Sequence, residues 1–196
     1  IRMVTGVQTC ALPISRAAAS SNLAEFVLKT GLRSLAIFGI LEDLTRASKS
    51  KDANEREGAM VAFETLFRKV GLAGGADPFF VPLLPVILDR YQESGKAEVI
   101  KDAAEKAAKQ LVRLSPPELA PKIIEELFLV IEGGAKWRSK VGALELLATF
   151  ATTAKDQVAE SLGDYVPRLS GAMRDTKPEV SLVDVGAKFW FSPTRS

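Results

Sequence analysis

The sequence predicts an all-α fold made of stacked antiparallel helix pairs. After Asn22, apolar residues recur at steps of three and four, a spacing that places them on one face of a helix. The alternation of apolar and polar residues that marks half-buried strands is missing. Similar helical segments also recur along the chain at intervals of 39 to 45 residues.

The clearest amphipathic helices lie in the second half of the chain. The first apolar stripe comprises Trp137, Val141, Leu144, Leu147 and Ala151. The second comprises Val158, Leu162, Tyr165, Val166, Leu169 and Met173. Only the short polar stretch TAKDQ separates them, and so short a connection favours an antiparallel hairpin.

Capping residues and prolines mark where helices begin or break. In the stretch SPPE, Ser115 is a predicted N-cap and Glu118 lies three residues later, as in a capping box. In TKPE, Thr176 has the same predicted role. Pro82 and Pro85 each remove one backbone donor, so the helix containing them should be kinked or begin late.

The recurring segments predict a specific architecture. Their equivalent positions are Ala59, Ala104, Ala143 and Leu182, spaced 45, 39 and 39 residues apart. Two-helix repeats of about 40 to 47 residues are typical of HEAT and armadillo proteins. We therefore expect a HEAT-repeat α-solenoid of about three and a half to four hairpins over residues 21–180. Residues 1–20 are predicted to be a non-native or disordered stretch, and residues 181–196 a divergent or truncated tail.

Residues 1–16 have an unusual composition. They contain Arg2 and Arg16 but no acid, and they account for the whole net charge of 26 − 24 = +2. A secretory signal and an organelle transit peptide are two interpretations. The third, which we favour, is that VTGVQTCALPI at residues 4–14 is translated sequencing adapter. Without it the chain has no cysteine, which suits a reducing compartment.

The remaining composition argues against an enzyme. Histidine is absent, the only cysteine lies in the N-terminal stretch, and no phosphate loop of the form GxxxxGK[ST] occurs. We therefore predict no catalytic residue, no metal site and no cofactor. The adjacent acids Glu125 and Glu126 are interpreted as part of a solvated helix face. No run of 18 apolar residues occurs, so no membrane span is expected.

Several motifs carry a family resemblance over residues 22–181. They are TGLRSLAIFGIL at 30–41, REGAMVAFETL at 56–66, the KW pair at 136–137, TAKDQVA at 153–159, VPRLSGAM at 166–173 and DTKPEV at 175–180. This region resembles the N-terminal HEAT region of fungal translation elongation factor 3. It is also similar to the HEAT block of the large general-control scaffold that activates a starvation-sensing kinase.

The resemblance implies a function that the residues alone do not. Members of the elongation factor family are cytoplasmic ATPases whose two cassettes bind ATP and Mg²⁺ and lie C-terminal to the HEAT region. They promote release of exit-site tRNA and delivery of aminoacyl-tRNA. The HEAT region is then expected to contact ribosomal RNA and proteins and other elongation factors, with no membrane and no small-molecule substrate. The alternative is a HEAT scaffold that binds proteins only.

Cationic side chains near two predicted turns are the candidate ribosome contacts. They are Lys136, Arg138, Lys140, Arg174 and Lys177. Equivalent turns of a solenoid line up along one edge, so these residues are expected to form a ridge that faces rRNA phosphates. A solvated surface is the alternative, since Asp156, Asp175 and Glu179 are near in sequence. Trp137 is interpreted as a core residue, with base stacking as the alternative.

Overall fold

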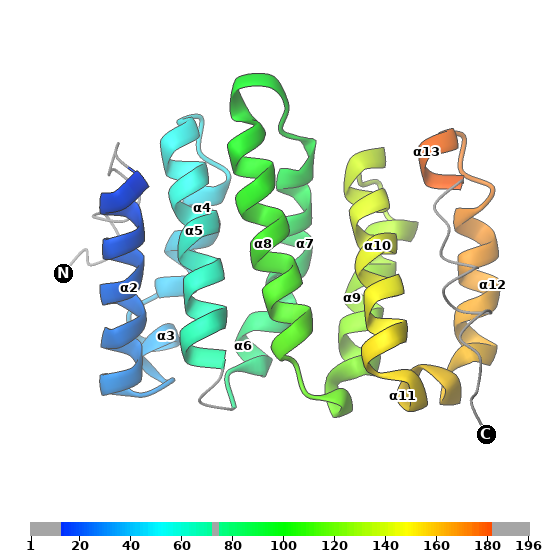
Figure 1. The fold of residues 1–196 in the computed structure, drawn as a ribbon, viewed down its shortest axis with the longest axis horizontal. Coiled ribbons are helices and arrows are strands. Elements are labelled where there is room, and N and C mark those ends of the chain that lie inside the picture. The colour runs from blue at the N-terminus through cyan, green and yellow to red at the C-terminus, as the bar shows by residue number, and fades with distance from the viewer. Residues whose placement is uncertain (1–12, 72–74, 182–196) are drawn as a thin grey trace. The chain divides into compact units, whose positions relative to one another are not determined.

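The computed structural model describes residues 13–71 and 75–181 of the chain. Across these ranges every regular element is a helix, and none of the described residues lies in a strand (Figure 1). The chain divides into an N-terminal unit, residues 1–114, and a C-terminal unit, residues 115–196. The predicted all-α helical-repeat fold is confirmed. None of the described helices has the length and apolar character that crossing a membrane requires.

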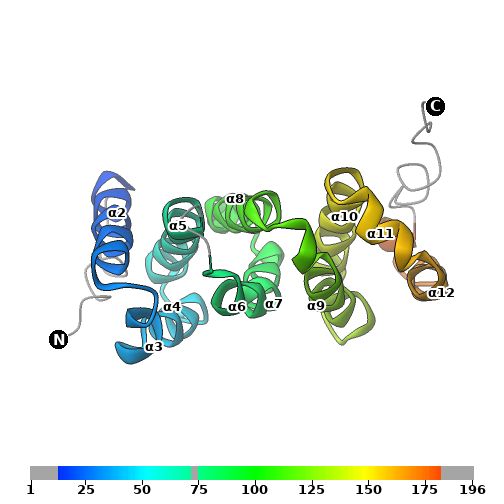
Figure 2. The same cartoon turned by 90° about the horizontal axis from the view of Figure 1, so that it is seen from below.

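The N-terminal unit has two layers of helices. Its elements are α2 (Pro13–Thr30), α3 (Ser34–Ile37), α4 (Ile40–Ser48), α5 (Ala53–Val70), α6 (Asp77–Phe80), η2 (Val81–Leu83), α7 (Leu84–Leu88), η3 (Asp89–Gln92), η4 (Gly95–Ala97) and α8 (Glu98–Leu114). Figure 2 shows α2, α5 and α8 side by side in one row, with α3, α4, α6 and α7 in a second row. Each long helix therefore covers the apolar side of its neighbour.

Small and aromatic residues fill the space between these layers. Ala59 on α5 and Ala104 on α8, both placed by the repeat spacing, are fully buried and allow close helix approach. Phe63 stacks on Phe67 with ring centroids 6.0 Å apart, and Phe67 contacts Phe80 at 4.8 Å. Burying a side chain of this size contributes about 1.5–3 kcal/mol each, so packing between layers is the main source of stability.

The proline-containing helix is broken, as the sequence predicts. Pro82 lies in the 3₁₀ turn η2 and Pro85 in the first turn of the short helix α7. Each proline lacks an N–H, so the segment from Asp77 to Gln92 alternates between α and 3₁₀ turns. Buried side chains such as Leu84 and Ile87 keep the broken segment packed against α8.

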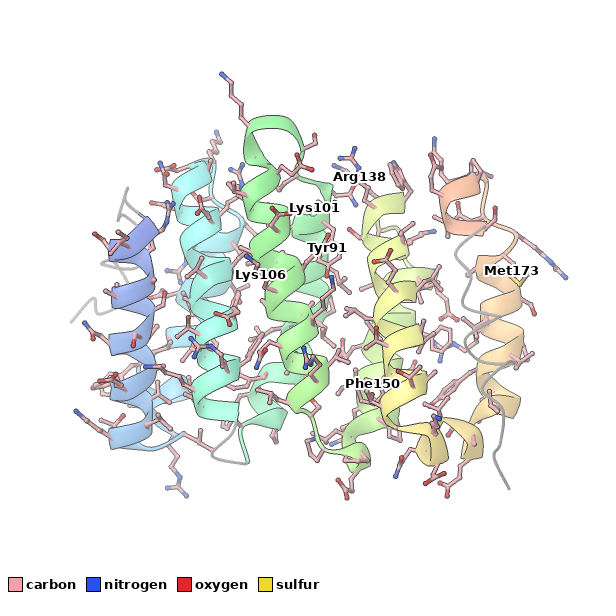
Figure 3. The ribbon with its side chains drawn as sticks, viewed as in Figure 1. Tyr91, Lys101, Lys106, Arg138, Phe150 and Met173 are labelled. Atoms are coloured by element: carbon pink, nitrogen blue, oxygen red, sulfur yellow. The ribbon has the colours of Figure 1, made fainter. Side chains whose placement is uncertain are left out.

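The C-terminal unit is built around one helix pair. Its elements are η5 (Pro117–Leu119), α9 (Ala120–Glu132), α10 (Trp137–Thr153), α11 (Lys155–Glu160), α12 (Leu162–Ala172) and α13 (Pro178–Ser181). Helices α9 and α10 pack together, α11 and α12 contact α9, and α13 contacts α10. Leu144 and Leu147 of the first predicted stripe are buried, whereas Met173, the last member of the second stripe, is 67% exposed beside the end of α12 (Figure 3).

Helix α2 begins earlier than the repeat region was predicted to begin. It starts at Pro13, and residues 13–20, placed by the sequence in a non-native or disordered stretch, form its first turns. The reason is anchoring that only the fold supplies. Arg16 reaches Glu57 and Asn54 on α5, and the Ser20 hydroxyl donates to the Arg16 carbonyl oxygen. Residues 1–12, with Cys10 and most of the proposed adapter, and residues 182–196, with Leu182, lie outside the described residues.

Two predicted caps are displaced. The 3₁₀ turn η5 has Pro116 at its N-cap and α9 begins only at Ala120, so the chain does not enter α9 directly after Ser115. Helix α13 begins at Pro178, and the Lys177 N–H donates to the carboxylate of Asp175, not to the hydroxyl of Thr176. In both places the true start lies one or more residues later than the capping pattern predicts, because a proline restricts the residue before it.

Candidate nucleic-acid interface

The five predicted contact residues come from two segments of the C-terminal unit. Lys136 is the N-cap of α10, and Arg138 and Lys140 lie in its first turns. Arg174 and Lys177 belong to the connection between α12 and α13. These segments lie at the same end of the unit, where α13 packs on α10 (Figure 1). We call this group of five side chains the cationic ridge.

The ridge residues differ in how much of each side chain is available. Lys136, Arg174 and Lys177 are exposed, and Arg138 is half-buried with its guanidinium carbon 5.2 Å from the centre of the Trp137 ring. Figure 3 labels Arg138 at the start of α10. The Lys140 side chain is only 18% exposed and forms an ion pair with Asp175.

That ion pair joins the two segments. The Lys140 ammonium lies 2.9 Å from one Asp175 oxygen, and the other Asp175 oxygen accepts the Lys177 N–H at 3.0 Å. Hydrogen bonding to Lys140, and next to the Lys177 N–H, holds the pKa of the Asp175 carboxyl below its ordinary value. The carboxylate stays ionised at neutral pH and offsets one of the five charges.

Trp137, interpreted from sequence as a core residue, is half-buried at the first position of α10. The neighbouring guanidinium of Arg138 lies over its ring, a contact that indole favours through the negative face of its π-system. Trp137 is therefore a partly exposed neighbour of the ridge as well as a packing residue.

Sequence reasoning missed a second charged cluster in this unit. The Arg168 guanidinium, on α12, donates two hydrogen bonds to Glu125 at 2.7 and 3.1 Å and two to Glu132 at 2.6 and 2.8 Å. It also lies over the Phe128 ring, 4.0 Å from the centroid. We call these four residues the arginine clamp. It holds α12 on α9, where Tyr165 is the buried residue of α12.

The clamp adds a partner to the acids on α9. Glu125 is exposed, as predicted for a solvated helix face, and it is also bound by Arg168. Hydrogen bonding to Arg168 lowers the pKa of Glu132, whereas burial, with the nearby charge of Glu125, raises the pKa of Glu126. The signal in the sequence was the spacing of Glu125, Phe128 and Glu132, which places all three on one helix face.

We expect acid to loosen the arginine clamp. The pKa of Glu132 in the folded protein is lowered, so its contribution is complete above the ordinary value of 4.5 and is lost as the pH falls through the lower folded value. Hydrogen exchange of the α12 amides, corrected for intrinsic rates, should therefore accelerate as the pH falls below the ordinary value of 4.5. In R168Q the exchange should already be faster at neutral pH, and an unchanged acid response in that variant would contradict the assignment.

An open pocket of about 340 Å³ lies between α5 and α8 of the N-terminal unit. Its lining includes Glu57, Glu64, Asp102 and Lys106, with Val61, Val99 and Ala103 as apolar surface. Figure 3 labels Lys106 beside α8. The carboxylates of Glu57 and Glu64 already bind Arg16 and Arg68. Within the described residues no group of three or more side chains suited to holding a metal ion occurs.

Comparison with known proteins identifies the family. Residues 16–182 match the EF3 N-terminal HEAT repeat. The chain belongs to this family. The match begins at Arg16, in the second turn of α2, and extends through α13. What the family match covers is the HEAT repeat, so the chain holds no ATPase cassette of elongation factor 3.

Relatives of this EF3-type HEAT region are much longer proteins. Elongation factor 3 of Gonapodya prolifera is 34% identical over 178 residues, which span 90% of this chain and 16% of that protein. The mRNA export factor elf1 of Schizosaccharomyces pombe is 35% identical, over 76% of this chain and 14% of that protein. The stalled ribosome sensor GCN1 of Mus musculus is 29% identical, over 84% of this chain and 6% of that protein.

Proposed function

We propose that this HEAT region belongs to a ribosome-associated translation elongation factor of the cytoplasm and supplies contacts to ribosomal RNA and ribosomal proteins. In this proposal the whole protein is an ATP-binding-cassette ATPase that promotes release of exit-site tRNA and delivery of aminoacyl-tRNA. Family membership supports the proposal, as do the names of two relatives, an elongation factor and a ribosome sensor. Other elongation factors are further proposed partners.

The observation that carries the proposal is the cationic ridge. Arg174 and Lys177 are exposed and form no ion pair within residues 13–71 and 75–181. Lys136 is exposed at the N-cap of α10, where the positive end of the helix dipole disfavours a cation. A phosphate backbone, by contrast, is attracted by both the side chains and the helix end.

Reversing three ridge charges is expected to abolish most ribosome binding. The variant K136E/R174E/K177E should bind purified 80S ribosomes at least about tenfold more weakly at 0.1 M salt, because up to three phosphate contacts are lost. The salt slope, meaning the slope of log affinity against log salt concentration, should fall by nearly one unit for each lost contact. Co-sedimentation across a salt series measures both the affinity and the slope. The variant K29E/R33E/R113E reverses three exposed cations of the N-terminal unit and is the matched control. Equal losses in both variants would contradict a localised ridge.

A HEAT scaffold that binds proteins only is the second candidate function. Exposed apolar side chains at the C-terminal end of α3 favour it, since Ile37 is 73% exposed and the C-cap residue Phe38 is 55% exposed. The Phe38 and Phe26 ring centroids lie 5.5 Å apart. Exposed apolar groups of this kind are typical of protein contacts. A scaffold of this type predicts ribosome binding that is absent or independent of salt, and I37E/F38E would then weaken partner binding while the ridge variant would not.

A further inference from the structure

Asp175 is an acid in the middle of the cationic ridge. An acid there weakens the attraction for a phosphate, so a ridge built only for charge would not contain it. The Asp175 carboxylate nevertheless has two partners in two different segments, the Lys140 side chain on α10 and the Lys177 backbone N–H. One oxygen ties the connection to α10, and the other closes a turn within the connection itself.

Burial distinguishes this ion pair from a loose surface contact. The Lys140 and Asp175 side chains are 18% and 16% exposed, whereas the neighbouring Arg174 and Lys177 are exposed. An ammonium held in such a pair must break it before it can reach a phosphate. Lys140 is therefore poorly placed to contact RNA directly, although its charge and its position in sequence predict such a contact.

The connection that carries Arg174 and Lys177 is bonded to the end of α12 through its backbone, since the Arg174 and Asp175 N–H groups donate to the Gly171 and Ala172 carbonyl oxygens. Tyr165 is the buried residue of α12 and Val180 that of α13, on either side of the connection. Between these two residues, the Lys140–Asp175 pair is the ion pair that ties the connection to α10. The spacing of Arg174 and Lys177 from Lys136 thus depends on this pair.

We propose that Lys140 and Asp175 are positioning residues of the interface, which hold Arg174 and Lys177 beside the start of α10 at the spacing that a phosphate backbone requires. This inference rests on the proposed function and refines it, since it assigns phosphate contact to the exposed cations and removes it from Lys140.

The proposal makes a prediction opposite to that of simple electrostatics. The substitution D175N removes one negative charge from the middle of the ridge. By charge alone, this change should strengthen binding to an anionic surface. Without the ion pair, however, Arg174 and Lys177 are no longer held. We expect D175N to bind 80S ribosomes about fivefold more weakly than the wild-type chain, with a salt slope lower by one to two units, because up to two phosphate contacts are lost.

Two further variants sharpen the test. D175A should bind more weakly than D175N, because asparagine retains an oxygen that can accept the Lys177 N–H. E179Q also removes one negative charge from this part of the unit, but Glu179 is exposed on α13 and takes no part in the ion pair. It should therefore bind as tightly as the wild-type chain or more tightly. If D175N instead tightens binding as E179Q does, the positioning role is wrong.

The charge-swapped variant K140D/D175K separates positioning from folding. It restores an ion pair between α10 and the connection without changing the net charge, and we expect it to recover at least half of the affinity that D175N loses. If D175N unfolds the C-terminal unit, seen as loss of helical circular dichroism, the ribosome affinity of K140D/D175K tests the proposal instead. Recovered binding supports the proposal, and binding as weak as that of D175N overturns it. A wild-type chain that shows no salt-dependent binding would refute the proposed function itself, whichever way the Asp175 variants behave.

Discussion

Replacing Arg16 by alanine is expected to lower the free energy of unfolding of the N-terminal unit by about 3 kcal/mol, the low end of the range for breaking a buried ion pair. The Arg16 side chain is 4% exposed and pairs with Glu57 at 2.8 Å, so its removal leaves a mostly buried carboxylate without a partner. We expect the low end of this range because the buried Nε–H of Arg16 has no acceptor among the described residues, so the wild-type guanidinium is itself incompletely hydrogen-bonded. Urea denaturation followed by circular dichroism measures the change.

Arg46 offers a matched control for this prediction. It pairs with Asp43 on α4, but its side chain is 77% exposed. Ion pairs of this kind contribute roughly 0–1 kcal/mol, so R46A should change stability only slightly. If R16A and R46A have equal effects, Arg16 is not part of the folded core, and the first turns of α2 do not belong to the repeat structure.

Replacing Phe67 by alanine is expected to be still more destabilising, by about 3–5 kcal/mol, as for other large-to-small changes at buried aromatic residues. Phe67 is 1% exposed and contacts the rings of both Phe63 and Phe80, one from its own helix and one from α6. The substitution leaves a cavity between the two helix layers that the surrounding backbone cannot close. The same denaturation experiment gives the free energy change.

Two other substitutions test whether burial is the cause. F67L keeps most of the volume and should cost about 1–2 kcal/mol. F38A removes an identical side chain that is 55% exposed in the folded protein. It should lower the free energy of unfolding by about 1 kcal/mol or less, because the Phe38 ring buries little apolar surface. If F38A lowers the free energy of unfolding as much as F67A does, burial is not what sets the effect of these substitutions.

The helices and their recurrence could be predicted because both depend on local pattern. The spacing of Leu144 and Leu147 marks the buried face of α10, and the equivalence of Ala59, Ala104 and Ala143 places three fully buried alanines in corresponding helices. The clustering of ridge cations was also predictable, since the start of α10 and the α12–α13 connection each follow a recognisable helix boundary.

The pairing of charges was not predictable in the same way. Lys140 and Asp175 are 35 positions apart, and Arg16 and Glu57 are 41 apart. Arg168 finds Glu125 and Glu132 across a similar distance in sequence. No local pattern says which acid a given cation will meet, because that depends on how neighbouring repeats pack. The sequence therefore did not indicate that Glu125 binds Arg168, or that Lys140 pairs with Asp175.

By itself, the amino-acid sequence determined the helical class, the repeat length and the family, because these follow from the spacing of apolar residues and from motifs within single helices. Tertiary structure alone decided which cations remain available to a partner and which are consumed in holding helices together. The physical reason is that an ion pair between helices depends on positions in space, whereas helix periodicity is already present in the order of residues.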